Sequence, residues 1–202
     1  MNDSQTVSSP MAAFADCNQP NGAGEVGLKI VEFPFQAYHN LRLDSANPAH
    51  REAVRAVYAL DLPLDANRIQ ESADATAYWL SPDEWLIRCS DAEAQKISEL
   101  KQRLDGEHIA ATDISSGMTH LRLAGDAVEA VLRQGTAFDL HPGVFASGQC
   151  AQTAMAHSNV LFARPGDMEN VIDLLVRRSF ADHIMAFLQD AAHDYGFSLS
   201  RN

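Results

Sequence analysis

The alternation of hydrophobic and polar residues predicts secondary structure along most of the chain. Residues 28–43 alternate with a period of two and are interrupted at Pro34, which is typical of extended strands. Asn47 is a favourable N-cap and Pro48 suits the first helical position, so a helix is expected to begin there. The pattern then predicts strands at 68–71, 76–81 and 85–89, and a helix opened by Ser90 and ending near Leu104.

The second half of the chain repeats this order of elements. Strands are expected at 109–114 and 119–123, followed by a short helix that opens at Gly125. Three further strands are expected at 149–157, 160–163 and 171–177. Ser179 is expected to cap the final helix, whose apolar face contains Phe180, Ile184, Phe187, Leu188, Ala191 and Tyr195. Each half reads strand, helix, two or three strands, helix, which indicates a weak internal duplication.

This order predicts an α+β fold of two similar lobes, built from mainly antiparallel sheets with packed helices. We expect one domain at 26–202, with lobes at about 26–106 and 107–197. Residues 1–25 are rich in Ser, Ala, Asn, Gly and Pro and show no period. They are therefore expected to form a tail that is disordered or held by a partner. Three glycines at 22, 24 and 27 have dinucleotide-loop spacing, but no strand precedes them, so we reject that motif.

Composition narrows the classes of partner. The chain has 202 residues, with 15 Lys and Arg against 27 Asp and Glu, a net charge of -12. Such a surface repels phosphate backbones and anionic lipids, so we expect neither a nucleic-acid partner nor a membrane partner. The cysteines, Cys17, Cys89 and Cys150, are few and widely spaced. That usage indicates a reducing compartment, and we expect a cytoplasmic protein with no disulfide framework or zinc site.

Two places in the sequence carry candidate binding chemistry. Asp113 ends a strand just before a Gly-containing turn, where it can bind a polar ligand or simply accept hydrogen bonds from turn amides. Arg177 and Arg178 join the last strand to the last helix and can bind a carboxylate, a phosphate or a partner surface, or pair with neighbouring acids. The eight His show no metal-ligand spacing, and no nucleophile elbow or phosphate-binding loop is present. We therefore assign no catalytic, cofactor-binding or metal-binding residue.

Several short stretches resemble known proteins when read in order. Those that resemble the aminomethyltransferase fold, the folate-binding fold of the glycine-cleavage T-protein, are 112–115 (Thr-Asp-Ile-Ser), 121–127 (Leu-Arg-Leu-Ala-Gly-Asp-Ala) and 138–140 (Phe-Asp-Leu). Those that resemble the gamma subunits of heterotetrameric sarcosine oxidases are 79–86 (Trp-Leu-Ser-Pro-Asp-Glu-Trp-Leu), 138–142 (Phe-Asp-Leu-His-Pro), 148–153 (Gly-Gln-Cys-Ala-Gln-Thr) and 175–181 (Leu-Val-Arg-Arg-Ser-Phe-Ala). The resemblance covers roughly residues 26–197.

The resemblance implies a noncatalytic subunit of a larger oxidoreductase. Such a complex oxidatively demethylates sarcosine to glycine, passes the methyl carbon to tetrahydrofolate and reduces oxygen to hydrogen peroxide. The resemblance implies that the partners are alpha, beta and delta subunits, and that FAD, FMN, NAD and tetrahydrofolate bind to those partners and not to this chain. It also implies a structural role, which agrees with the lack of a recognisable nucleophile or dinucleotide loop.

Two alternatives remain open from the sequence. The chain can be the equivalent subunit of a related complex that oxidises another N-methyl amino acid, such as N-methylglutamate dehydrogenase, because the substrate pocket would lie in a different chain. It can also be a stand-alone folate-binding module. Folate-binding relatives that serve iron–sulfur assembly carry a Lys-Gly-Cys-type motif, and residues 147–150 (Ser-Gly-Gln-Cys) depart from it.

Overall fold

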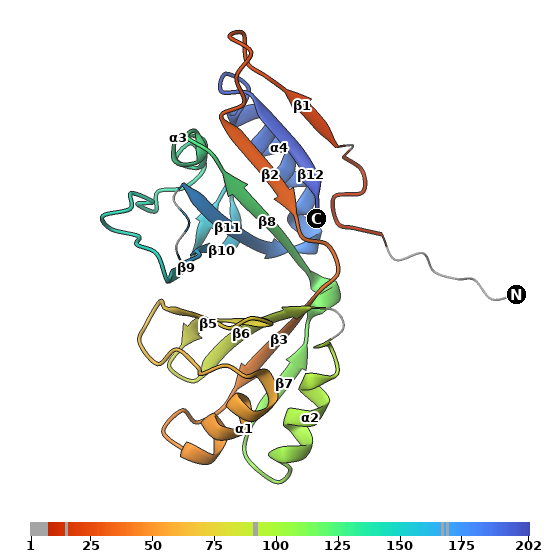
Figure 1. Ribbon diagram of the computed structural model, residues 1–202, viewed down its shortest axis with the longest axis vertical. Coiled ribbons are helices and arrows are strands. Elements are labelled where there is room, and N and C mark those ends of the chain that lie inside the picture. Colours follow the sequence, from red (N-terminus) through yellow and green to blue (C-terminus); the bar gives the residue numbers. More distant parts are fainter. Residues whose placement is uncertain (1–7, 15, 91–92, 167, 169) are drawn as a thin grey trace, which may run out of the picture.

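Two β-sheets face each other in the computed structural model, which describes residues 8–14, 16–90, 93–166, 168 and 170–202 (Figure 1). The large sheet has the order β1 (Cys17–Gln19), β12 (Phe197–Arg201), β2 (Leu28–Glu32), β8 (Met118–Ala124), β11 (Val171–Arg177), β10 (Ser158–Arg164) and β9 (Gln149–Met155). The small sheet has the order β4 (Ile69–Glu71), β5 (Ala75–Ser81), β6 (Glu84–Ser90), β3 (Gln36–Arg42) and β7 (Ala110–Asp113). The sheets are antiparallel except that β12 runs parallel to β2, which confirms the predicted α+β class with mainly antiparallel sheets.

Helices α1 (Pro48–Tyr58) and α2 (Lys96–Arg103) cover the outer face of the small sheet (Figure 1). Helix α1 begins as predicted, because the Asn47 side chain accepts a hydrogen bond from the Ala49 amide at 2.9 Å and Pro48 follows the cap. Trp85 is fully buried beneath the helices and donates its indole N–H to the Pro63 carbonyl at 2.8 Å. The small lobe therefore has its own hydrophobic core, formed by one face of its sheet and two amphipathic helices.

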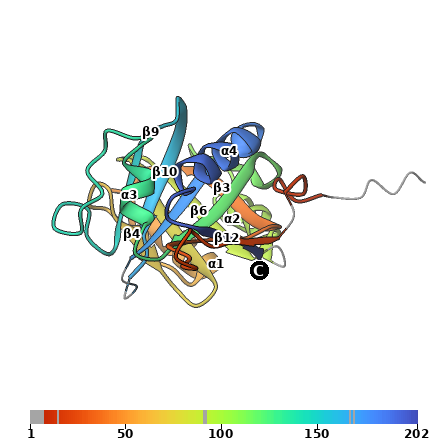
Figure 2. The same cartoon turned by 90° about the horizontal axis from the view of Figure 1, so that it is seen from above.

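Helices α3 (Val128–Leu132) and α4 (Ala181–Ala191) lie on the outer side of the large sheet, nearest the viewer in Figure 2. The final helix differs in detail from the prediction. Ser179 lies in the 3-10 turn η3 (Arg178–Phe180) and supplies no cap, and Phe180 and Tyr195 are 41% and 38% exposed. Ile184, Leu188 and Ala191 are buried as expected, and Met185 joins them. Likewise Ser90 ends β6 instead of opening a helix, because α2 begins only at Lys96.

The chain crosses between the sheets twice, which corrects the predicted lobe boundaries of 26–106 and 107–197. The crossings are at 33–35, where the chain passes from β2 to β3, and at 114–117, where it passes from β7 to β8 through the 3-10 turn η2 (Ser115–Gly117). The small lobe is thus the contiguous stretch 36–113, inserted between two paired strands of the large sheet. The sequence shows where strands lie but not which sheet each one joins. The two lobes therefore do not correspond to two successive halves of the chain, and the predicted boundaries were wrong.

The segment before Val26 is not wholly a tail. Strand β1 pairs antiparallel with β12, placing Cys17 opposite Leu199, and the Met11 side chain is fully buried. Gly196 has φ +72° and lies so close to the Glu25 carbonyl that a Cβ there would be 2.2 Å from its oxygen. The expectation of a tail outside the fold is therefore wrong for these residues, whereas residues 1–7 lie outside the described part of the chain.

Candidate binding site between the two sheets

The inner faces of the two sheets pack against each other through buried side chains. This interface cluster is formed by Tyr38, Ile69, Tyr78, Leu86, Cys150, Leu161, Ala163 and Leu175. Backbone hydrogen bonds fix the two lobes at one edge, because the Ile69 amide donates to the Gly148 carbonyl at 3.0 Å and the Cys150 amide donates to the Asn67 carbonyl at 2.9 Å. The lobes are therefore joined by packing and by hydrogen bonds as well as by the two crossing segments.

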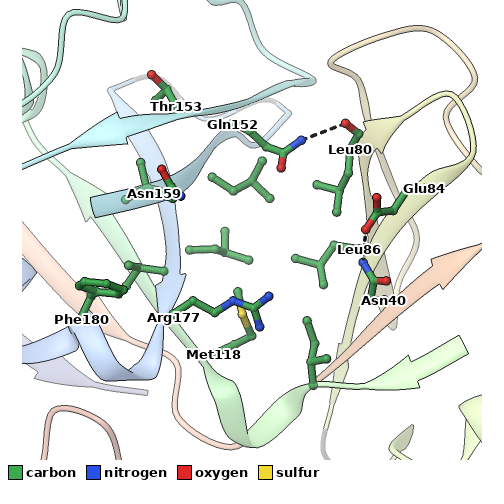
Figure 3. A pocket seen from close by; sticks show the side chains of 15 residues that line it. Asn40, Leu80, Glu84, Leu86, Met118, Gln152, Thr153, Asn159, Arg177 and Phe180 are labelled. Carbon is green, nitrogen blue, oxygen red and sulfur yellow. Dashed lines mark hydrogen bonds between the residues drawn. The ribbon is translucent and has the colours of Figure 1, made fainter. Parts of the chain in front are cut away.

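A cavity of about 550 Å³ opens between the sheets beside this cluster (Figure 3). Its volume lies in the range of small-molecule and peptide-side-chain pockets, roughly 300–1,000 Å³. The apolar part of the lining comes from both sheets and consists of Leu80, Leu86, Ile114, Met118, Val160, Leu161, Leu175, Val176 and Phe180. The polar part consists of Asn40, Glu84, Gln152, Thr153, Asn159 and Arg177. The site thus combines a largely apolar wall with a few polar groups at its rim.

Three of the six polar side chains at the rim are already hydrogen-bonded within the chain. The Asn40 side-chain amide donates to Glu84 Oε1 at 2.8 Å, and Arg42 Nε lies 3.7 Å from Glu84 Oε2. Gln152 Nε2 donates to the Leu80 carbonyl at 2.9 Å and so ties the large sheet to the small one across the cavity, as Figure 3 shows. These contacts hold the walls in place before anything binds, which reduces the entropy that a ligand or partner must lose.

A buried ionic cluster lies deeper in the same interface. Arg122 donates from Nε and Nη2 to the two oxygens of Asp173 at 2.7 and 2.9 Å, and its guanidinium lies 5.2 Å from the ring centroid of Phe33. Burial alone would raise the pKa of Asp173, but the hydrogen bonds from Arg122 and the nearby His120 outweigh it and hold that pKa well below its usual range. Asp173 therefore stays ionised although its side chain is only 5% exposed.

His120 completes this cluster as a neutral ring. Its Nε2 lies 3.3 Å from Asp173 Oδ2, and its ring stacks on Phe33 with the centroids 4.9 Å apart. The side chain is wholly buried, and this burial lowers its pKa despite the nearby carboxylate. Across the interface, burial raises the pKa of Tyr38 well above normal, and the charges of Arg88 and Asp173 both act on it. The ionic cluster is thus buried and links two neighbouring strands of the large sheet, β8 and β11, on the side that faces the small lobe.

The three residues singled out from the sequence have different positions. Arg177 lines the cavity, and Figure 3 shows its guanidinium pointing inward between Met118 and Gln152. Arg178 points elsewhere and donates to the Ser8 carbonyl at 2.8 Å. Asp113 does not line the cavity. It accepts hydrogen bonds from the backbone amide of Ser115 at 2.9 Å and from the Ser115 hydroxyl, so it stabilises the turn, which is the simpler of its two possible roles. Arg177 and Arg178 also line a second pocket together with Asp182, whereas Asp113 lines neither pocket.

Metal and thiolate chemistry have little support at this site. Among the described residues, no group of three or more His, Cys, Asp or Glu side chains is placed to hold a metal ion. Burial raises the pKa of the Cys89 thiol to about 11 and that of the Cys150 thiol to about 12, so both are protonated near neutral pH. No helix in the described part of the chain is long and apolar enough to cross a membrane. The arrangement is suited to binding, with one cation over an apolar wall.

The sequence reasoning missed Asp173, Arg122 and His120. A signal was present, because Asp173 is a single charge inside the apolar run 171–176 and Arg122 is a single charge between Leu121 and Leu123. Charges in strands that are apolar on both sides are rarely buried without a partner. A partner of opposite charge was therefore to be expected for each of them. Only the β8–β11 register, which sets Arg122 opposite Asp173, shows that the two side chains pair with each other.

The comparisons with known proteins agree with this fold and with one another. Residues 42–194 match the family described as sarcosine oxidase, gamma subunit family. The sarcosine oxidase subunit gamma of Corynebacterium sp. (strain P-1) is 31% identical over 178 residues, 88% of this chain and 85% of the relative. That of Corynebacterium sp. (strain U-96) is 30% identical over 174 residues, 86% of this chain and 83% of the relative.

Solved structures extend the likeness to three dimensions. A chain of the heterotetrameric sarcosine oxidase from Corynebacterium sp. U-96 in complex with pyrrole 2-carboxylate matches with a TM-score of 0.82 and 29% identity, covering 93% of this chain and 95% of that one. The glycine cleavage system aminomethyltransferase T from Bartonella henselae matches with a TM-score of 0.62 at 14% identity, covering 88% of this chain and 48% of that one, and shares the fold alone. This chain belongs to the sarcosine oxidase gamma subunit family.

Proposed function

We propose that this chain is the gamma subunit of a heterotetrameric sarcosine oxidase and that its role in the complex is structural. The observation that supports this best is the match, over 93% of this chain and 95% of the other, to a chain of a heterotetrameric sarcosine oxidase. The two sheets are joined by the buried interface cluster and by hydrogen bonds between the lobes, which suits a subunit that holds larger partners together. The two buried thiols, both with raised pKa, are poor nucleophiles, which also favours a structural role.

In the proposed complex the chemistry belongs to other chains. Sarcosine is oxidatively demethylated to glycine, its methyl carbon passes to tetrahydrofolate as a methylene group, and oxygen is reduced to hydrogen peroxide. The partners are the alpha, beta and delta subunits, which carry FAD, FMN, NAD and tetrahydrofolate. The complex is cytoplasmic in this proposal, in line with the three cysteines, Cys17, Cys89 and Cys150, all of which are free thiols.

Purification from the native cells tests this proposal. A tag on this chain is expected to bring down three further subunits, identified by mass spectrometry, in a yellow complex that releases hydrogen peroxide when sarcosine is added. A complex that oxidises N-methylglutamate but not sarcosine would instead assign the chain to that related dehydrogenase. A colourless protein that purifies alone would refute the subunit role, and titration of that protein with tetrahydrofolate would then test the stand-alone folate module.

A further inference from the structure

Arg177 is an unneutralised positive charge on a strongly acidic chain. It is exposed, it lines the inter-sheet cavity, and it has no hydrogen-bond or ion-pair partner among the residues that the structure describes. The other charged residue in the lining, Glu84, is held by Asn40 and Arg42. Most other arginines in the described part of the chain are likewise bound to a carboxylate or a carbonyl. Within the described residues, the cavity therefore presents one unpaired cation, beside apolar side chains and the polar side chains of Thr153 and Asn159.

Apolar side chains that remain accessible surround this cation. Phe180 lines the same cavity from the corner between β11 and α4 and is 41% exposed, although it is a large aromatic residue. Met118 is half-buried and lies next to Arg177 (Figure 3). An exposed aromatic residue beside an arginine is the composition enriched at protein–protein interfaces, where charges other than Arg are depleted. In a free monomer, the apolar side chains of this rim and the guanidinium of Arg177 would remain exposed to water.

We propose that this cavity is a docking site for a partner subunit, which inserts a carboxylate side chain next to Arg177 and packs an apolar residue against Phe180. Charge complementarity selects the partner's chemistry, because a guanidinium binds a carboxylate through two parallel hydrogen bonds. With a net charge of -12, this chain repels acidic segments over most of its surface, so an acidic segment is steered to the Arg177 rim. The hydrogen bond from Gln152 to the Leu80 carbonyl ties the two walls of the cavity to each other. This inference rests on the proposed function.

Competition for a place in the complex tests the docking site. Cells that make all four subunits would also make a second copy of this chain with Arg177→Glu, at a level equal to the wild-type copy. The complex would be purified through a tag on another subunit, and mass spectrometry would measure the ratio of the two copies in it. We expect Arg177→Glu to be depleted by about tenfold or more, because reversal places two like charges in contact. Arg177→Lys, which keeps the charge, should be depleted much less.

Lys101→Glu is the matched control. Lys101 is exposed on α2, is not part of the cavity lining, and has no ion-pair partner among the described residues. It should enter the complex within about twofold of wild type. Incorporation of Arg177→Glu at the level of Lys101→Glu would overturn the docking site. If Arg177→Glu entered the complex at that level while free benzoate bound only the wild-type chain, the cavity would instead belong to a small carboxylate. A wild-type chain that enters no complex would refute the proposed function itself.

Discussion

Replacement of Asp173 by Asn tests how much the buried ionic cluster stabilises the pairing of β8 and β11 in the large sheet. The carboxylate takes both hydrogen bonds from Arg122, at 2.7 and 2.9 Å, and lies 3.3 Å from His120 Nε2. Asn has the same shape but no charge and only one oxygen, so Arg122 loses one acceptor and its counter-charge. The side chain of Asp173 is 5% exposed and that of Arg122 is 23% exposed. Water can therefore recover only part of what the guanidinium loses.

The expected loss of unfolding free energy follows from this geometry. Breaking a buried pair by removing one partner costs roughly 3–5 kcal/mol, and the partial exposure of Arg122 places this case near about 3 kcal/mol. For a chain of this size that corresponds to a fall in Tm of about 6–12 °C. The double variant Arg122→Met, Asp173→Leu removes both charges together. It should therefore lose about 1–3 kcal/mol less unfolding free energy than the sum of the losses in the two single variants.

Urea unfolding of the purified chain followed by circular dichroism measures these differences. Asp190→Asn is the matched control, since Asp190 is exposed on α4 and should change stability by less than about 0.5 kcal/mol. If Asp173→Asn unfolds within about 1 kcal/mol of wild type, or if the double variant equals the sum of the singles, the ionic cluster does not stabilise the large sheet.

Three other perturbations have defined outcomes. Burial lowers the pKa of both His39 and His120, so between about pH 7.5 and about pH 5 the unfolded chain binds more protons than the folded chain. The unfolding free energy should therefore decrease as the pH falls through this range, and equal urea midpoints at the two pH values would contradict the prediction. Gly125→Ala should lower Tm strongly, because φ is +120° and a Cβ would lie 2.4 Å from the Gly27 carbonyl oxygen; an unchanged melting curve would argue against this close approach. Trp85→Ala should cost about 3–5 kcal/mol in urea unfolding, because the indole is fully buried; a cost below about 1 kcal/mol would mean that the small-lobe core repacks.

Local features of the fold were predictable because local patterns determine them. The helix after Asn47 and the strands on either side of Pro82 follow from a cap, a fixed proline φ and alternating side chains, all within a few residues. The α+β class and the antiparallel pairing follow from the order of these elements. Arg177 was found for a related reason, since two adjacent arginines stand out on an acidic chain.

The remainder depends on contacts between distant residues. Strands β2 and β3 are separated by only three residues, yet they join different sheets. Pro34 indicates a break in the extended segment, but the sequence of 33–35 does not show that the chain passes to another sheet there. Strand β12 was missed because its alternation spans only Phe197–Arg201 and its partner β2 is at the other end of the chain. The cavity was equally inaccessible, because its lining comes from both sheets and from strands more than a hundred residues apart.

Arg201 links the two ends of the chain, and its replacement by Met tests whether the first described residues belong to the fold. Its guanidinium lies 3.2 Å from Glu32 Oε2, donates to the Met11 carbonyl at 2.7 Å and contacts Asp16. Glu32 is 1% exposed, so removing the cation leaves a buried carboxylate with fewer partners and should cost about 3–5 kcal/mol. Hydrogen exchange in β1 should then accelerate far more than exchange in β8, whereas Arg133→Met, at a 70% exposed side chain, should change neither strand. If β1 stays protected in Arg201→Met, its pairing with β12 suffices to hold the N-terminal segment, and the guanidinium is not what makes that segment part of the large sheet.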